Sequence, residues 1–217
     1  MIRIVIVDDH DLVREGIRAL LEQDPIFQVV GETGDGQEAI RLATRLRPDA
    51  LLMDVSLPGG IGGLEATEAI VADCPGVKVI ILTQYEHREY IQRAIRIGAR
   101  GYLLKRSVAA QLKDAIKTVY QGQRYLHPAA AEELAELVAT GRALEEDDYD
   151  RLTPREKQVF KLLAEGKTSR DIAKYLTISL KTAMTHRTNL MTKLEMHSRA
   201  ELIRYAIRKA IISLEGP

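Results

Sequence analysis

The stretch 50-ALLMD-54 places four apolar residues directly before an aspartate, and the chain repeats this arrangement three more times. The other runs are IVIV before Asp8 and Asp9, VIIL before Thr83, and GYLL before Lys105. Short aliphatic runs of this kind are typical of buried parallel strands, and ligands of open α/β sheets bind outside the carboxyl ends of such strands. We therefore expect three acids, a hydroxyl and an ammonium group to meet in one crevice.

Strand-like and helix-like segments alternate five times between residue 2 and about residue 121. The predicted strands are 2–7, 27–32, 50–54, 78–83 and 100–104, and the predicted helices are 11–23, 36–47, 61–73, 87–97 and 108–121. Right-handed crossovers between parallel strands place the helices on both faces of the sheet. The pattern predicts a doubly wound, five-stranded parallel α/β sheet, flavodoxin-like with strand order 2-1-3-4-5, over residues 1–125.

The bulk composition fits a globular chain. The 217 residues, 46% of them hydrophobic, are enough to bury one large core or two ordinary ones. The single cysteine, Cys74, excludes an internal disulfide and fits a reducing compartment. The sequence contains no apolar stretch of about 18 residues. Its first apolar run is followed by Asp8 and not by the cleavage site of a signal peptide. We expect a soluble, cytoplasmic protein with no membrane partner.

Charge is divided unevenly along the chain, although the formal net charge is zero. Residues 151–217 carry 14 Lys/Arg against 6 Asp/Glu, a net charge of +8, whereas residues 132–150 hold eight acids and one arginine. A basic module suits a polyanionic partner, and an acidic block has little to bury. We predict an acidic linker over 126–150, with a short helix in its first part, followed by a separate small all-α domain over 151–217.

The basic segment contains four predicted helices, at 154–165, 169–176, 180–194 and 199–212. Thr153 and Ser198 each begin a predicted capping box, Thr168 and Ser179 are predicted N-caps, and Gly166 stands where the first helix must stop. The second and third helices have the lengths and the tight connection of a helix-turn-helix, whose second helix enters the major groove of DNA.

The crevice has the residue types that phosphoryl chemistry requires. Three crowded carboxylates repel one another, and a hard divalent cation such as Mg²⁺ relieves that repulsion. A carboxylate so placed can attack a phosphoryl group while the metal and a lysine neutralise its oxygens. Each residue alone has an ordinary alternative: Asp9 or Asp11 as a helix cap, Thr83 as a strand-end threonine, Tyr102 as a packed aromatic, Lys105 as a surface lysine. Their joint occurrence at four strand ends favours the chemistry.

With these residues in place, residues 1–121 resemble a two-component receiver domain. The resemblance implies a phosphoacceptor, a Mg²⁺ site and a set of switch residues. These would be Asp54 as the phosphoacceptor; Asp8, Asp9, Asp54 and the Ser56 backbone carbonyl as metal ligands; and Thr83, Tyr102 and Lys105 as switch and phosphate contacts. The chain departs from the family pattern after the acceptor, where four glycines within 57–63 predict an unusually permissive loop.

Two consecutive segments are similar to the LuxR-type DNA-binding domain: LTPREKQVFKLLAEGKTSRDIAKYL (152–176) and SLKTAMTHRTNLMTKL (179–194). A receiver joined to this output resembles the NarL/FixJ class of response regulators. The expected DNA-binding residues are Lys167, Arg170, Lys181, Thr182, Met184, Thr185, Arg187, Thr188 and Lys193. The resemblance also implies a dimer contact on the last helix, through Ala200, Ile203, Ala206, Ile207 and Ala210. Ala183, His186 and Leu190 are spaced for packing, and Met184 and Thr188 stand where many family members carry lysines.

These features predict a phosphorylation-dependent transcription regulator and not an enzyme. Its expected partners are a sensor histidine kinase, double-stranded promoter DNA and a second copy of itself. Two alternatives stay open. An aspartate-nucleophile phosphotransferase is disfavoured because Ser56 stands where a second aspartate is needed. A transcription factor with an unphosphorylated receiver is disfavoured by the complete acidic set.

Overall fold

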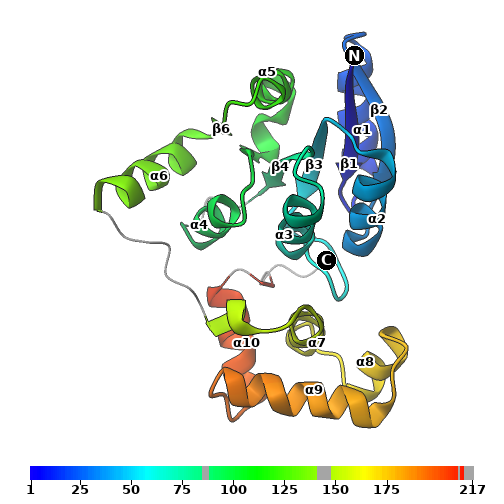
Figure 1. The fold of residues 1–217 in the computed structure, drawn as a ribbon, viewed down its shortest axis with the longest axis vertical. Helices are drawn as coiled ribbons and strands as arrows, with labels where there is room; N and C mark the ends of the chain where they lie inside the picture. The colour runs from blue at the N-terminus through cyan, green and yellow to red at the C-terminus, as the bar shows by residue number, and fades with distance from the viewer. Residues whose placement is uncertain (85–87, 141–147, 210, 213–217) are drawn as a thin grey trace. The chain divides into compact units, whose positions relative to one another are not determined.

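The computed structural model describes residues 1–84, 88–140, 148–209 and 211–212. The chain divides near residue 144 into two compact units, an N-terminal α/β unit and a C-terminal helical unit. Figure 1 shows the sheet with its covering helices in blue to green, and the helices of the second unit in yellow to red. In the described part of the chain, no helix has both the length and the apolar composition needed to cross a bilayer.

The N-terminal unit is built on a parallel sheet of six strands in the order β2-β1-β3-β4-β5-β6. The strands are β1 Ile2–Val7, β2 Phe27–Thr33, β3 Ala50–Asp54, β4 Lys78–Thr83, β5 Gly101–Leu104 and β6 Tyr125–Leu126. The predicted order of the first five is confirmed, but the predicted number of strands is wrong. The two residues of β6 are too few for a recognisable strand pattern, and they pair beside Gly101 and Tyr102 at the edge of the sheet.

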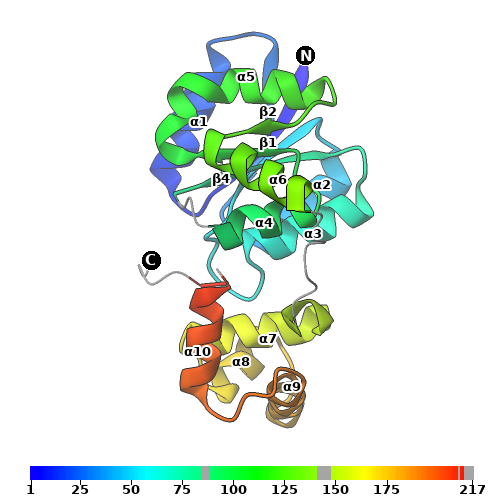
Figure 2. The same cartoon turned by 90° about the vertical axis from the view of Figure 1, so that its left-hand side faces the viewer.

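Helices cover both faces of this sheet (Figures 1 and 2). They are α1 Asp11–Glu22, α2 Gly36–Leu46, α3 Gly63–Asp73, α4 Arg88–Arg96, α5 Val108–Tyr120 and α6 Pro128–Thr140. Alternate residues of β1 pack with α1 and α5 in one core cluster, as the two-residue period of a strand requires. The other face carries α2, α3 and α4, and α6 packs against α4. The helix predicted at 61–73 begins at Gly63, two residues late, because Gly62 is its N-cap.

In its described residues, the C-terminal unit consists of a short 3-10 turn, η2 Asp148–Arg151, and four helices. The helices are α7 Pro154–Ala164, α8 Ser169–Tyr175, α9 Leu180–Lys193 and α10 Arg199–Arg208. The first capping box is confirmed, since Thr153 and Glu156 bond each other's backbone N–H groups. The prediction that α10 runs to residue 212 is wrong, because the helix ends at Arg208.

The other predicted helix starts are also found, with one difference. Thr168 begins α8 in a full capping box with Asp171, and the Ser179 side chain accepts from Thr182 N at the start of α9. Ser198 likewise accepts from Glu201 N at the start of α10. The predicted second capping box is incomplete, however. The Glu201 carboxylate accepts from the His197 N–H and from the Ser198 hydroxyl, both at 2.9 Å.

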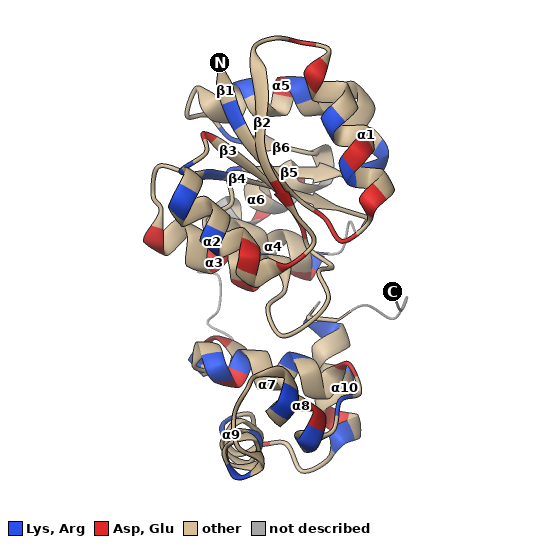
Figure 3. Ribbon diagram, turned by 90° about the vertical axis from the view of Figure 1, so that its right-hand side faces the viewer, with Lys and Arg blue, Asp and Glu red and all other residues tan. Residues whose placement is uncertain are grey.

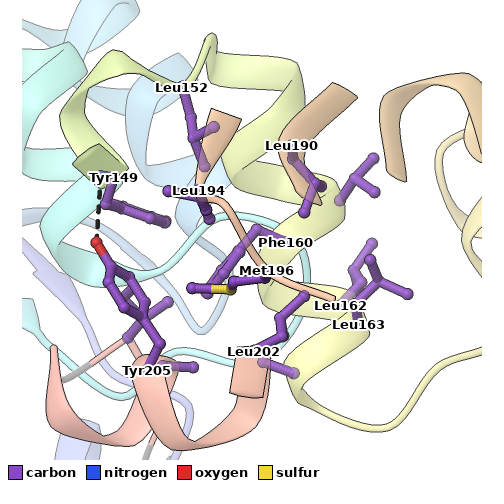
Figure 4. Packing of buried hydrophobic residues seen from close by; sticks show 14 of the residues in the cluster. Tyr149, Leu152, Phe160, Leu162, Leu163, Leu190, Leu194, Met196, Leu202 and Tyr205 are labelled. Atoms are coloured by element: carbon purple, nitrogen blue, oxygen red, sulfur yellow. Dashed lines mark hydrogen bonds between the residues drawn. The ribbon is translucent and has the colours of Figure 1, made fainter. Parts of the chain in front are cut away.

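Three aromatic rings hold the core of the C-terminal unit together (Figure 4). Phe160 lies edge-on to both Tyr149 and Tyr205, with ring centroids 5.3 and 6.0 Å apart, and the Tyr149 N–H donates to the Tyr205 hydroxyl at 3.2 Å. Pairs of this geometry contribute about 0.5–1.5 kcal/mol each beyond the area they bury. Tyr149 falls within the predicted linker, so the end of that segment is part of a folded core.

Candidate functional site

The predicted acids, hydroxyl and ammonium group follow or end four neighbouring strands, β1, β3, β4 and β5. Val7 of β1 lies beside Met53 of β3, so the residues that follow them, Asp8 and Asp54, are neighbours. Thr83 ends β4 beside Leu104, and Lys105 comes directly after β5. The convergence predicted from the four apolar runs is therefore found in the structure.

Lys105 links the two buried carboxylates. Its Nζ lies 2.7 Å from Asp8 Oδ2 and 2.8 Å from Asp54 Oδ2. Asp8 is fully buried, Asp54 is 2% exposed, and the lysine side chain is 13% exposed. Two carboxylates this close repel each other, and the ammonium group between them offsets that repulsion.

The same contacts set the ionisation of the site. Burial raises the pKa of Asp54, the Lys105 ammonium opposes that shift, and the charge of Asp8 adds to it, leaving the pKa above its ordinary value. Burial alone would lower the pKa of Lys105, but the two carboxylates outweigh burial and raise it. Lys105 therefore carries its charge at neutral pH.

The acids, together with His10, also form a group of side chains that could bind a metal ion. One ligand atom from each of Asp8, Asp9, His10 and Asp54 lies within 4.8 Å of the others. Asp9 Oδ1 is buried and lies 2.9 Å from His10 Nδ1, without a well-formed hydrogen bond in the described structure. His10 also holds Asp8, since its N–H donates to Asp8 Oδ1 at 2.9 Å.

Two residues of this region were not predicted. His10, which follows the two acids, occupies the N-cap position of α1, so neither Asp9 nor Asp11 caps that helix. Arg14, one turn into α1, donates to the Asp8 carbonyl oxygen at 2.5 Å. The position of His10 next to the acid pair was a sequence signal that could have drawn attention to it. The contact of Arg14 depends on the angle of α1 to the sheet, which the sequence does not show.

A glycine allows the backbone of Asp54 to approach α3. The Gly63 N–H donates to the Val55 carbonyl at 3.2 Å, and a Cβ at position 63 would lie 1.8 Å from the Asp54 carbonyl oxygen. Gly59, in the same loop, has φ +87°. At these two positions the glycines are required by close approach and by left-handed backbone.

The two predicted switch residues are buried. Thr83 is 1% exposed and Tyr102 is 2% exposed. Leu103 belongs to the core cluster under α1 and α5, so its neighbour Tyr102 faces the opposite side of the sheet, where α4 lies. The Tyr102 carbonyl accepts a hydrogen bond from the His127 N–H at 3.0 Å, which joins the strand to the residue that precedes α6.

The second candidate site is the helix-turn-helix formed by α8 and α9. Thr177, in the connection between the helices, has φ 52°. On α9, Ala183 and Leu190 are buried and His186 is half-buried, as predicted. Figure 3 shows Lys and Arg on all four helices of the unit. All of the predicted DNA-binding residues are exposed: Lys167, Arg170, Lys181, Thr182, Met184, Thr185, Arg187, Thr188 and Lys193.

Within both the predicted DNA-binding set and the predicted dimer set, the residues differ in their contacts or burial. Lys193 Nζ donates to Glu156 Oε2 at 2.7 Å, so this lysine already ties the end of α9 to the capping box of α7. On α10, Ala206 is fully buried, whereas Ile203 and Ile207 are half-buried and Ala200 is exposed. The predicted Ala210 lies outside the described residues.

Comparison with known proteins identifies the two units. Residues 4–117 match the family described as response regulator receiver domain, and residues 150–206 match the luxR family of bacterial regulatory proteins. The chain therefore belongs to the NarL/FixJ class of response regulators, in which a receiver domain is joined to a LuxR-type DNA-binding domain. Proteins of this family regulate transcription.

Relatives match this chain over nearly its whole length. The transcriptional regulatory protein LiaR of Bacillus subtilis is 39% identical over 215 residues, covering 98% of this chain and 100% of LiaR. The oxygen regulatory protein NreC of Staphylococcus carnosus is 37% identical over 214 residues, covering 97% and 99%. Among solved structures, the RcsB response regulator of Salmonella typhimurium is 28% identical with a TM-score of 0.57, covering 94% and 97%. A LuxR-family response regulator from Aurantimonas is 40% identical with a TM-score of 0.59, covering 64% and 99%.

Proposed function

We propose that this response regulator is controlled by phosphorylation of Asp54 and that the phosphorylated form binds promoter DNA as a dimer. The observation that carries the proposal is the Asp8–Lys105–Asp54 cluster, with Nζ to oxygen distances of 2.7 and 2.8 Å at the carboxyl edge of the sheet. Burying two carboxylates and an ammonium group is costly in desolvation, and ionisable groups perturbed in this way cluster at functional sites.

The chemistry is transfer of a phosphoryl group from a kinase histidine. A carboxylate oxygen of Asp54 forms a bond to phosphorus while the bond from phosphorus to the histidine nitrogen breaks, and the electron pair of that bond remains on the imidazole. Lys105 then lies beside the new phosphoryl oxygens and neutralises part of their charge. Asp54 must be ionised to attack, and Lys105 favours that form by opposing the effect of burial on its pKa.

A Mg²⁺ ion fits the same pocket. Its ligands would be Asp8, Asp9 and Asp54, with the Ser56 backbone carbonyl, and hard carboxylate oxygens are the donors that Mg²⁺ prefers. The buried Asp9 Oδ1, which lacks a well-formed hydrogen bond, is an oxygen that such an ion would satisfy. When bound, Mg²⁺ would neutralise phosphoryl oxygens during transfer.

The phosphoryl group would be sensed by Thr83 and Tyr102. Thr83 would move toward the new charge, and Tyr102 would rotate into the space released beside α4. The Tyr102 backbone is bonded to His127, so a change at β5 is passed to β6 and α6. The solved structures of RcsB bound to promoter DNA in the presence of phosphomimetic BeF3⁻ support a link between phosphorylation and DNA binding in a relative.

The DNA-binding step would use the exposed face of α9. Lys181 and Arg187 would contact phosphates together with Lys167 and Arg170, positioning the helix in the major groove. The partly exposed Ile203 and Ile207 of α10, with Ala200, would form the dimer contact. RcsB, a relative, has been solved as dimers bound to DNA. We place the action of the protein in the cytoplasm, and the domain boundaries near 125 and 150 stay predictions.

The test is Mg²⁺-dependent labelling of the full chain with acetyl phosphate. Asp54→Asn should abolish labelling, and Asp73→Asn, a change of an exposed acid at the end of α3, should leave it unchanged. Labelled protein should bind promoter DNA more tightly than unlabelled protein. DNA binding with no labelling would support the alternative of a phosphorylation-independent factor. Continuous release of phosphate with many turnovers per chain would support the phosphotransferase alternative.

A further inference from the structure

The N-terminal half of α9 carries two large apolar side chains that its own unit does not cover. Leu180 is 43% exposed and Met184 is 54% exposed. They lie four residues apart, one helical turn, so they are neighbours on one face. The buried face of the helix contains Ala183 and Leu190 instead, and the buried Leu194 is its C-cap. The core therefore does not account for Leu180 and Met184.

The surroundings of these two residues extend the apolar surface. Leu180 and Met184 border a shallow depression that is also lined by Lys181, Thr185, Thr188 and Asn189. The Thr185 hydroxyl donates to the Lys181 carbonyl at 3.0 Å within the helix. Its hydrogen is therefore used internally, and the methyl group of Thr185 adds to the apolar part of the depression. We call Leu180, Met184 and Thr185 the apolar patch of α9.

The occupant of the patch follows from charge and geometry. Residues 151–217 carry a net charge of +8, and the exposed Lys181 and Arg187 flank the patch. The patch lies at the N-terminal end of α9, the second helix of the helix-turn-helix. In this motif, the N-terminal residues of the second helix contact the base edges in the major groove. Among the groups that base pairs present in that groove, the C5-methyl of thymine is the apolar one.

We infer that Leu180 and Met184 read thymine methyl groups, so that specificity within the half-site depends on A·T pairs. This inference rests on the proposed DNA-binding function and adds the chemical group that is recognised. Lysine at these positions would favour guanine through its O6 and N7 acceptors, whereas leucine and methionine gain by removing a methyl group from water.

The test begins with selection of duplexes from a random library by the acetyl phosphate-treated full chain. Each thymine of the enriched half-site is then replaced by deoxyuridine, which removes the methyl group and keeps base pairing. One or two positions should lose affinity by about fourfold each, the effect of exposing one methyl group. In Leu180→Ala and Met184→Ala the ratio of thymine to deoxyuridine affinity at the matching position should fall toward one. Leu12→Ala, a change of an 81% exposed leucine on α1, should leave the ratio unchanged.

The outcomes separate this inference from the function on which it rests. If no duplex is enriched, both fail. Enrichment with equal affinity for thymine and deoxyuridine at every position overturns the inference and leaves the proposed function in place. Variants that bind DNA with unchanged discrimination but lose self-association would place the patch in a protein contact and would also overturn the inference.

Discussion

The substitution Gly63→Ala tests how tightly the acceptor segment is packed against α3. A Cβ at this position would lie 1.8 Å from the Asp54 carbonyl oxygen, and real Cβ atoms essentially never approach closer than 3.0 Å. The two segments must therefore separate by about 1.2 Å. The contact is with backbone, so a rotamer change of a side chain cannot relieve it.

This displacement acts on the reacting group. The Asp54 carboxylate lies 2.8 Å from Lys105 Nζ, and a displacement of the Asp54 backbone by about 1.2 Å would disturb that hydrogen bond. A misplacement of about 1 Å at a reacting group costs on the order of 100-fold in rate. The strain should also lower the free energy of unfolding by about 3 kcal/mol, the upper end of overpacking costs. We expect both effects together.

The assay is the initial rate of labelling by acetyl phosphate with saturating Mg²⁺, together with urea unfolding followed by circular dichroism. Gly16→Ala is the matched control, because a Cβ at Gly16, in the middle of α1, meets no atom within 4 Å. That variant should label normally and gain about 0.5–1 kcal/mol from the better helix former. Gly63→Ala with wild-type labelling and wild-type stability would refute the packing argument. Lost stability with a normal labelling rate would show that α3 yields instead of Asp54.

Three further predictions concern stability. Arg93→Ala removes the 2.6 Å ion pair between Arg93 and Glu65, whose side chains are 7% and 12% exposed, and urea unfolding should show a loss of about 3 kcal/mol. Arg41→Ala removes an exposed pair of α2 and should cost less than about 0.5 kcal/mol; equal losses would contradict the role of burial. Folding raises the pKa of Asp54 above 3.8, so ionisation of this group lowers the free energy of unfolding. That loss develops as the pH rises through the folded pKa. Asp54→Asn should therefore raise the unfolding free energy at pH 7, with a gain that shrinks toward pH 4, and a constant gain would argue against this. Thr153→Ala removes the N-cap of α7 and should cost about 1 kcal/mol in thermal unfolding, whereas Thr153→Ser should restore it.

The strand ends were predictable because burial on both faces leaves a continuous apolar run, and the residue after such a run must lie at the edge of the sheet. The caps of α7, α8 and α9 were predictable because they depend on residues three positions apart. β6 was not, since a two-residue strand has no periodicity and exists because the edge of β5 is available. Glu201 at α10 shows the same limit, because its choice of the His197 N–H depends on the angle at which the chain enters the helix.

The sequence predicted most of the residues that lie in the candidate sites, but it could not predict their hydrogen-bond and ion-pair partners. The sequence placed Lys105 near the acids, yet its position between Asp8 and Asp54, 2.7 and 2.8 Å from their oxygens, depends on how the chain turns after β5. Lys193 is a similar case: the sequence predicts a phosphate contact for it, which stays a prediction, but gives no sign of its bond to Glu156 on another helix. Helical spacing likewise could not separate the buried Ala206 from the half-buried Ile203, because both fit one apolar stripe.

The position of β6 gives the proposed switch a defined route along the chain. Tyr102 is buried on the α4 side of the sheet, and its backbone pairs with β6 and accepts from the His127 N–H. Pro128 follows at once and begins α6, which packs against α4 and is joined to it by the 3.3 Å Arg88–Glu136 pair. The two elements that would respond to phosphorylation, the Tyr102 strand and α4, therefore both contact the segment that leads toward the DNA-binding unit. A rotation of Tyr102 that shifts α4 cannot leave α6 unaffected, because α6 is tied to both.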